Sequence, residues 1–337
     1  MNNKYLPSIS IVIATKNNER TLGKLLQDIK DQDYSKDKLE TIIVDGRSTD
    51  KTLKIIRKIG FKTRVYQAKF PNDPEICKGE GISYSKSELV LLLDSDNYLP
   101  SKNWIKNLVA PLIEDNELVG SYTTRFKYVK KDNYLNRYFA LIGSADPVGL
   151  YLGKADRMSY VSEKWTGFGK LVKETKKYFV IVFNGMDFPT LGSNGFLVRR
   201  KILANVKSDP PNFFHIDVPF DLAKKGYGSY ALVKGETGHD TAAKFIPYLI
   251  KRVNYVKLHY QKRAKDRRYK VFDPNRKEDL LRITLFIIFS LTIIQPLYIS
   301  IKGFSRTRDW VWFVHPLFCF AIVITYAIAI LQKRFIK

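Results

Sequence analysis

Apolar residues in the first hundred positions follow two alternating patterns. Short runs of branched apolar residues predict buried strands, and the stretches between them place apolar residues at helical spacing. We expect strands at 8–15, 39–44, 63–67 and 89–93, with helices at 19–30, directly after residue 50, and from about 76 to 85. Strands that alternate with helices through short links favour a parallel sheet covered by helices.

The pattern loosens after Pro100, where the expected elements are less regular. We expect a helix at 104–114, a strand at 119–130, an aromatic helical stretch at 134–152 that Pro147 interrupts, a Gly-rich turn and strand at 190–200, and a helix at 218–225. Residues 1–240 are therefore predicted to form one α/β domain, with halves at 1–100 and 101–240.

Two long apolar segments follow near the C-terminus. Residues 283–301 contain 19 residues without a charge, and residues 310–331 contain 22 residues with only His315 as a titratable group. Each is long enough to cross a hydrocarbon core of about 30 Å. Trp310 and Trp312 suit a membrane interface. We predict two transmembrane helices within 281–337, with a cytoplasmic C-terminal tail.

The basic residues beside these segments predict an orientation. Six of them flank the pair on the outside and three lie in the loop between the segments (Arg276, Lys277, Arg282, Lys333, Arg334 and Lys337, against Lys302, Arg306 and Arg308). Positive charge gathers on the cytoplasmic side of membrane proteins. We therefore expect a multi-pass protein of the cell membrane whose main domain is cytoplasmic.

The composition is strongly basic and favours an anionic partner. Lysine and arginine number 57 against 33 acidic residues, a net charge of +24. Residues 244–270 hold ten of these basic residues and only Asp266 as an acid. We interpret 241–280 as a basic amphipathic segment on an anionic membrane; a solvated helix face is the alternative.

No nucleic-acid motif accompanies the charge, so we expect no nucleic-acid partner. Cys77 and Cys319 form no disulfide framework or zinc pattern.

Two carboxylates one residue apart end the fourth predicted strand, in the triplet Asp94-Ser95-Asp96. In α/β folds, ligands collect at the carboxyl ends of strands. A divalent cation held there would neutralise a diphosphate leaving group. An isolated triplet of this kind also serves simply to end a strand, so its neighbours decide between the two interpretations.

Two further motifs precede this triplet at strand ends, Thr15-Lys16-Asn17 and Val44-Asp45-Gly46-Arg47-Ser48-Thr49-Asp50. Their order resembles that of the family 2 glycosyltransferases, which have the GT-A fold. The resemblance covers residues 8–100 and continues more loosely to about 240. It implies a Rossmann-like, mostly parallel central sheet with helices on both faces. Gly46-Arg47 departs slightly from the family pattern.

The resemblance implies a donor site for a nucleotide-diphosphate sugar. Its residues would be Thr15 and Asn17 in the nucleotide pocket, Asp45 at the base, Lys78 at the diphosphate or sugar, Asp94 and Ser95 at the donor, and Asp96 with Asp94 and His239 at Mn²⁺ or Mg²⁺. Oxygen ligands suit such ions. The alternatives are a turn cap for Asp45, a surface lysine for Lys78 and a loop histidine for His239.

The resemblance also implies a catalytic base and an acceptor loop. Asp217 in His215-Ile216-Asp217 would take the acceptor proton, although histidine stands where the family usually has glutamate; Asp221 is the competing candidate. Gly192, Asn194 and Gly195 would line the acceptor and sugar side.

Together these features predict a metal-dependent, inverting glycosyltransferase. It would pass sugar to a lipid-linked acceptor, a polyprenyl phosphate or polyprenyl-linked saccharide, at the cytoplasmic leaflet. The alternatives are a polysaccharide or cell-surface glycan synthase of the same fold, a nucleotidyltransferase, and a membrane scaffold with an inactive transferase domain.

Overall fold

The computed structural model describes residues 5–59, 61–162, 167, 169–184, 188–241 and 244–334. Contacts divide the chain into two compact units that are not continuous in sequence. Unit 1 combines residues 1–124 with 169–240, and unit 2 combines 125–168 with 241–337. The chain therefore leaves unit 1 after residue 124 and returns at 169. The domain boundaries at 240 and 280 that we expected from the sequence stay predictions.

The first four strands of unit 1 are parallel. They are β1 (Ile9–Thr15), β2 (Leu39–Asp45), β3 (Thr63–Gln67) and β4 (Leu89–Asp94), in the order β3-β2-β1-β4. Ile9 lies beside Leu39 on one side and Leu89 on the other, so the three strands begin and end level. The four predicted strands are confirmed to within one residue at each end.

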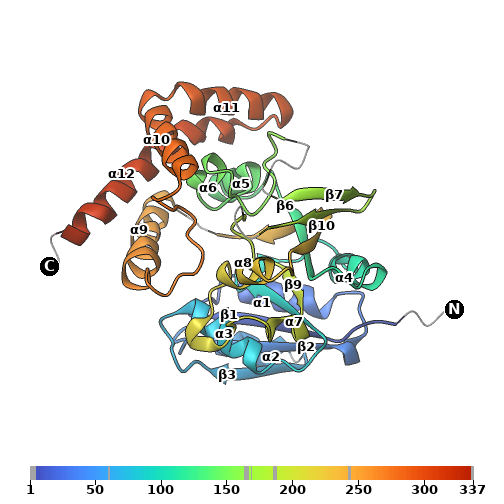
Figure 1. Ribbon diagram of the computed structural model, residues 1–337. Helices are drawn as coiled ribbons and strands as arrows, with labels where there is room; N and C mark the ends of the chain where they lie inside the picture. Colours follow the sequence, from blue (N-terminus) through green and yellow to red (C-terminus); the bar gives the residue numbers. More distant parts are fainter. Residues whose placement is uncertain are drawn as a thin grey trace. The chain divides into compact units, whose positions relative to one another are not determined.

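Helices cover both faces of this parallel part (Figure 1). Helices α1 (Leu22–Lys30) and α2 (Thr52–Ile59) pack on the odd-numbered residues of β1, in a core that includes Ile11 and Ile13. Helix α3 (Pro74–Ser83) packs on the other face, against Val12 and Ala14. Because successive strand residues point to opposite faces, the helices on the two faces together bury every residue of β1.

The other strands join the sheet mostly in antiparallel pairs. The full order is β3-β2-β1-β4-β9-β6-β10-β8-β7, and β5 pairs with β10. The added elements are η1 (Lys36–Lys38), β5 (Asn97–Tyr98), α4 (Trp104–Glu114), β6 (Gly120–Phe126), β7 (Lys170–Glu174), β8 (Tyr178–Val182), β9 (Phe196–Arg199), α7 (Arg200–Leu203), η2 (Pro210–Asn212), α8 (Asp217–Lys224) and β10 (Ser229–His239). Pairs β4–β9, β6–β9, β8–β10, β7–β8 and β5–β10 all run antiparallel. The sheet is therefore mixed, and the parallel arrangement that we predicted is confirmed for the first four strands.

Unit 2 is helical apart from the end of β6. It contains α5 (Tyr134–Ile142), α6 (Pro147–Tyr151), α9 (Phe245–Tyr255), the π-helix η3 (Val256–Lys262), α10 (Lys277–Thr292), α11 (Ile294–Arg306), η4 (Trp310–Val314) and α12 (His315–Arg334). The predicted interruption near Pro147 is present: α5 ends at Gly143, whose φ is 72°, and Pro147 is the first residue of α6. Proline suits that position because its missing N–H would have no helical partner there.

The two predicted membrane helices have different structures. Residues 310–332 form one helical stretch of 23 residues with a mean hydropathy of 2.3, long and apolar enough to cross a membrane. The other segment is two helices, α10 and α11, which meet at an angle of 84° and reach that length only together. Among the described residues, one continuous helix therefore has the length and composition of a span.

Candidate active site

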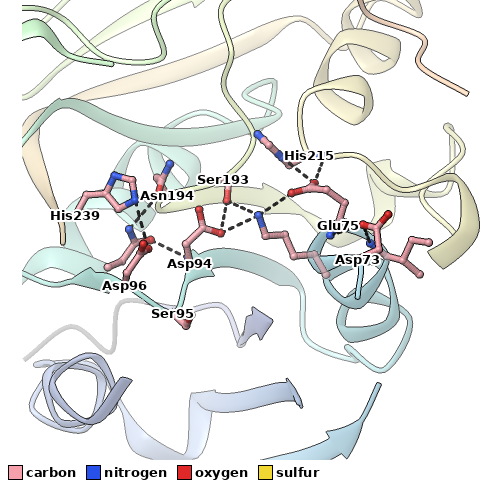
Figure 2. Close-up of polar contacts among 12 residues, drawn as sticks. Asp73, Glu75, Asp94, Ser95, Asp96, Ser193, Asn194, His215 and His239 are labelled. Carbon is pink, nitrogen blue, oxygen red and sulfur yellow. Dashed lines mark hydrogen bonds and ion pairs between the residues drawn. The ribbon is translucent and has the colours of Figure 1, made fainter. Parts of the chain in front are cut away.

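Polar side chains collect at the carboxyl ends of β1, β2 and β4 and at the end of β10, all within unit 1. Figure 2 shows Asp94 and Asp96 beside His239, Ser193 and Asn194, which come from distant parts of the sequence. The level ends of the parallel strands place their loops at one edge, where α/β folds bind ligands.

Asp94, Asp96 and His239 form a cluster suited to a metal ion. One ligand atom from each lies within 4.8 Å of the others, and all three side chains are partly exposed. His239 Nε2 is 3.3 Å from Asp96 Oδ1. His239 reaches this position because β10 pairs with β5 and sets it opposite Asn97. Two carboxylates and one imidazole fit Mn²⁺ well, and the carboxylates also fit Mg²⁺.

A buried lysine holds the other side of Asp94. Lys78 Nζ lies 2.8 Å from Asp94 Oδ1, 3.1 Å from Glu75 Oε1 and 3.1 Å from Ser193 Oγ. Ser193 Oγ donates to Asp94 Oδ1 at 2.8 Å. Lys78 and Glu75 are each 5% exposed. The lysine is therefore built into the site, and the alternative of a surface lysine is wrong.

The opposite charges in this network keep one another ionised. Burial by itself would lower the pKa of Lys78, but the carboxylates of Asp94 and Glu75 outweigh it and raise that pKa. Burial would likewise raise the pKa of Glu75, but His215 and Lys78 hold it well below its usual range. The lysine therefore stays protonated and Glu75 stays ionised.

His215 is fixed by two bonds to one carboxylate oxygen. Its backbone N–H donates to Glu75 Oε2 at 2.9 Å, and its ring Nδ1 lies 2.8 Å from the same atom. An ionised carboxylate only accepts, so Nδ1 carries the proton. Glu75 thus orients both Lys78 and His215 from helix α3.

The Gly-rich loop before β9 packs closely on the site. Gly192 has φ +124°, and a Cβ there would lie 1.8 Å from the carbonyl oxygen of His215, so only glycine fits. Asn194 Oδ1 accepts from Asn97 Nδ2 at 3.0 Å, and Asn97 Oδ1 accepts from the backbone of Asp94 at 2.8 Å. Gly195 donates to Leu92 in β4 at 2.8 Å. The loop is therefore tied to the strand that carries Asp94.

The predicted base lies next to this loop. Asp217 is the first residue of α8 and is completely buried, whereas Asp221, one turn later, is partly exposed. The close contact of Gly192 with His215 covers the start of α8.

The ends of β1 and β2 form a second group, expected at the nucleotide. Asp45 accepts from Ser48, through N–H at 3.0 Å and Oγ at 2.6 Å, which is the turn cap noted as its alternative role. Asn17 has φ +49° and accepts from the N–H of Thr49 at 2.8 Å. Thr15 Oγ1 is buried and has no hydrogen-bond partner in the described part of the chain. An orphan hydroxyl of this kind is the polar atom that a bound ligand would satisfy.

Ser95 serves a structural role between these groups. Its Oγ accepts from Asn18 Nδ2 at 2.7 Å, and its carbonyl oxygen accepts from Thr21 Oγ1 at 3.0 Å. These bonds fix the Asp94–Asp96 triplet against the start of α1.

Several residues of the site were not among the sequence predictions. Glu75, Ser193 and Asn97 carry the hydrogen bonds that position Lys78, Asp94 and Asn194. Glu75 and Lys78 are three apart on a helix, a spacing that places them on one face. That spacing was the one available signal, since Ser193 and Asn97 meet their partners only through the fold.

Comparison with known proteins identifies the family. The profile described as "Glycosyl transferase family 2" matches residues 10–182, just over half of the chain. The chain belongs to this family. The glycosyltransferase resemblance seen in the three strand-end motifs is thereby confirmed at the level of the family and its GT-A fold.

Individual relatives of this glycosyltransferase match over shorter lengths. Poly(ribitol-phosphate) beta-N-acetylglucosaminyltransferase TarS of Staphylococcus aureus is 30% identical over 104 residues, 30% of this chain and 18% of that protein. A Methanococcus voltae dolichyl N-acetyl-alpha-D-glucosaminyl phosphate 3-beta-D-2,3-diacetamido-2,3-dideoxy-beta-D-glucuronosyltransferase is 33% identical over 103 residues, 29% of this chain and 32% of that protein. The aligned part thus spans a third or less of these curated relatives.

A solved structure supports the same fold over almost the whole chain. Mannosyltransferase PcManGT from Pyrobaculum calidifontis, in complex with GDP-Man and Mn²⁺, superposes with a TM-score of 0.56 at 13% identity. The match covers 98% of this glycosyltransferase and 88% of PcManGT.

Proposed function

We propose that this chain is an inverting glycosyltransferase that uses a nucleotide-diphosphate sugar and Mn²⁺ or Mg²⁺. Its acceptor would be membrane-bound and lipid-linked, a polyprenyl phosphate or a polyprenyl-linked saccharide. The catalytic domain would face the cytoplasm. The cluster of Asp94, Asp96 and His239 at the end of β4 carries this proposal, because it joins family membership to a site of the right chemistry.

The residues divide the work between donor and acceptor. Asp94, Asp96 and His239 would hold the ion, which when bound neutralises charge on the departing diphosphate. Thr15, with its orphan hydroxyl, and Asn17 would contact the nucleotide. Lys78 would fix Asp94 and add positive charge near the donor.

The acceptor side uses the Gly-rich loop and helix α8. Gly192, Asn194 and Gly195 would let the sugar approach the backbone. Asp217 would take the proton of an acceptor hydroxyl as oxygen attacks the anomeric carbon opposite the leaving group, which inverts the centre. A phosphate acceptor needs little base assistance, so the role of Asp217 depends on the acceptor.

Two separate observations support a membrane-bound, lipid-linked acceptor. The apolar C-terminal helices and the basic segment before them fit an enzyme held at a membrane. The Methanococcus voltae relative is named for a dolichyl-linked acceptor, which favours a lipid-linked substrate. TarS is named for a poly(ribitol-phosphate) acceptor, and its similarity makes a cell-surface glycan the second candidate.

Donor hydrolysis by the purified full chain tests the transferase. A panel of nucleotide sugars would be incubated with Mn²⁺, Mg²⁺ or a chelator, with release of the nucleoside diphosphate measured. We expect one donor to be hydrolysed only with a cation. For Asp96→Asn we expect a fall of at least about 100-fold, since charge stabilisation at a leaving group is worth several kcal/mol.

The matched control is Asp33→Asn. Asp33 lies outside the site, and its side chain is 64% exposed. It should hydrolyse the donor normally. Full turnover in Asp96→Asn would reject the metal site, and no hydrolysis of any donor by a folded chain would favour an inactive scaffold. A chain that leaves every donor intact but releases pyrophosphate from a nucleoside triphosphate and a sugar 1-phosphate would instead indicate a nucleotidyltransferase.

A further inference from the structure

The chain turns back where the first apolar segment was expected to cross a membrane. Helices α10 and α11 meet at 84°, with Ile293 between them at φ +65°. A β-branched residue rarely adopts this conformation. Pro296 follows in the first turn of α11, where proline is tolerated. The bend is thus a built feature of the segment.

The loop after α11 is bound to the start of unit 2. Asp309 is 2% exposed and accepts from Tyr128 Oη at 2.6 Å and from Arg137 at 2.8 and 2.9 Å. The guanidinium of Arg137 also lies 5.3 Å from the Trp310 ring. A buried carboxylate with a charged and a neutral donor is a firm attachment.

The bond between Tyr128 and Asp309 shows on which side of a membrane the loop after α11 would lie, because Tyr128 is close in sequence to the end of β6. Tyr128 lies two residues after Phe126, the last residue of β6, so it stays within about 7 Å of that strand end. If 283–301 crossed the bilayer, Asp309 would lie about 30 Å away on the far side. Tyr128 cannot reach both places. The loop must lie on the side of the membrane where β6 ends.

The last helix is tied to unit 2 near its other end as well. Tyr326 bonds to Asp146 and accepts from Arg252 at 2.8 Å, and Gln261 donates to the carbonyl of Ala329 at 2.9 Å. One face of α12 is buried against the rest of unit 2. The opposite face exposes apolar residues at helical spacing (Leu317, Phe320, Ile324, Ile328 and Leu331), and exposed Phe313 in η4 precedes them. A helix with one packed side lies along the unit that it packs on.

The exposed faces of these helices are apolar with basic residues beside them. Ile294 is 75% exposed, and Leu281 and Tyr298 are each 61% exposed. The exposed basic residues at the helix ends are Lys277, Lys302, Arg306 and Arg308. Apolar surface of this extent marks an interaction site, and the adjoining positive charge complements anionic lipid.

We propose that α10, α11 and α12 form a monotopic membrane anchor, which enters one leaflet of an anionic bilayer and crosses none. This deepens the membrane association of the proposed function and replaces two crossings with one-sided insertion. All basic residues flanking the helices then lie on one side, which removes the charged outer loop that a two-span topology requires.

Side-specific labelling tests this topology. In a chain with Cys77→Ala and Cys319→Ala, a single cysteine is placed at exposed Ser305, after the predicted first span, or at exposed Asn116 in unit 1 as the reference. An impermeant maleimide is applied to spheroplasts and to inside-out vesicles. We expect both variants to react only in inside-out vesicles. Reaction of Ser305→Cys only in spheroplasts, or only after detergent, would overturn the proposal.

Vesicle flotation of the full chain tests the docking surface. Ile294→Glu with Tyr298→Glu should weaken binding to phosphatidylcholine–phosphatidylglycerol vesicles by about tenfold or more, since two apolar contacts are replaced by repelled charges. Val172→Glu, at an apolar residue 58% exposed in unit 1, is the control and should bind normally. Unchanged flotation of the double variant would overturn the docking face. Donor hydrolysis in detergent is measured in parallel, so a failed topology and a failed transferase are told apart.

Discussion

Among the residues that the structure describes, each unit contains one deeply buried lysine, and the two differ in what surrounds them. Lys78 in unit 1 contacts Asp94, Glu75 and Ser193, and the side chain of Asp94 is 27% exposed. Lys154 in unit 2 lies 2.7 Å from Asp279, and both side chains are 1% exposed. Lys154 also donates to the carbonyl of Val271 at 2.7 Å.

The surroundings of the two lysines distinguish a candidate active site from an ion pair that only holds the structure together. Both lysines are buried and paired, so burial and pairing alone do not mark function. Lys78 differs because its network opens, through Asp94, onto a cluster of ion ligands. The Lys154–Asp279 pair is closed on all sides and fastens α10 to the loop after α6.

The largest stability effect is expected at the closed pair. Lys154→Met leaves Asp279 buried without its cation, which should lower the free energy of unfolding by about 3–5 kcal/mol. Urea unfolding of detergent-solubilised protein would measure it. The double variant Lys154→Met with Asp279→Leu should recover most of the loss. If the single variant is as stable as the parent, the pair is not the fastening that we describe.

Lys78→Met should cost less stability and more activity. Asp94 can turn toward solvent, so we expect a loss of about 2 kcal/mol in unfolding free energy. Donor hydrolysis should fall at least about tenfold, since Asp94 loses its orientation beside the ion. Lys78→Arg is the conservative partner and should retain the charge. If Lys78→Met hydrolyses the donor at the unchanged rate, Lys78 has only a structural role, like Lys154.

The smallest effect is a pH dependence that originates at Glu75. Its pKa is depressed in the folded state, so its contribution to stability is present above its unfolded pKa and is lost as pH falls through the folded value. From about pH 5 downward, the parent should lose stability more steeply than Glu75→Gln, by up to about 1.4 kcal/mol per pH unit. Urea midpoints across this range would measure the slopes. Parallel slopes would contradict the ionised Glu75.

The sequence predicted the parts of the molecule whose pattern is local. The four parallel strands and the Asp94–Asp96 triplet follow from short apolar runs and the residues that end them, and both are present. The antiparallel strands β7, β8 and β10 were not predicted, because Gly235 and Gly238 interrupt β10 and exposed residues make up β7. Their place in the sheet depends on pairing across the fold.

In the candidate site, too, local features could be predicted and contacts across the fold could not. Asp45 was expected at the nucleotide base, but its oxygens bond to Ser48 three residues away, an interaction that the sequence gives only as an alternative. Glu75 contacts Lys78 from three residues away on the same helix, a spacing visible in the sequence, whereas Ser193 contacts it from 115 residues away. A bond across the longer separation leaves no periodic trace in a single sequence. The assignments of Thr15, Asn17 and Asp217 stay predictions.

The pairing of β5 with β10 also sets when the ion site is completed. Asp94 and Asp96 are in place once β4 has joined the sheet, but the imidazole of His239 comes from a strand synthesised more than 140 residues later. A nascent chain short of that strand holds two carboxylates and no third ligand. The cation affinity that we propose would therefore develop only after residue 239 has been made and β10 has joined the sheet.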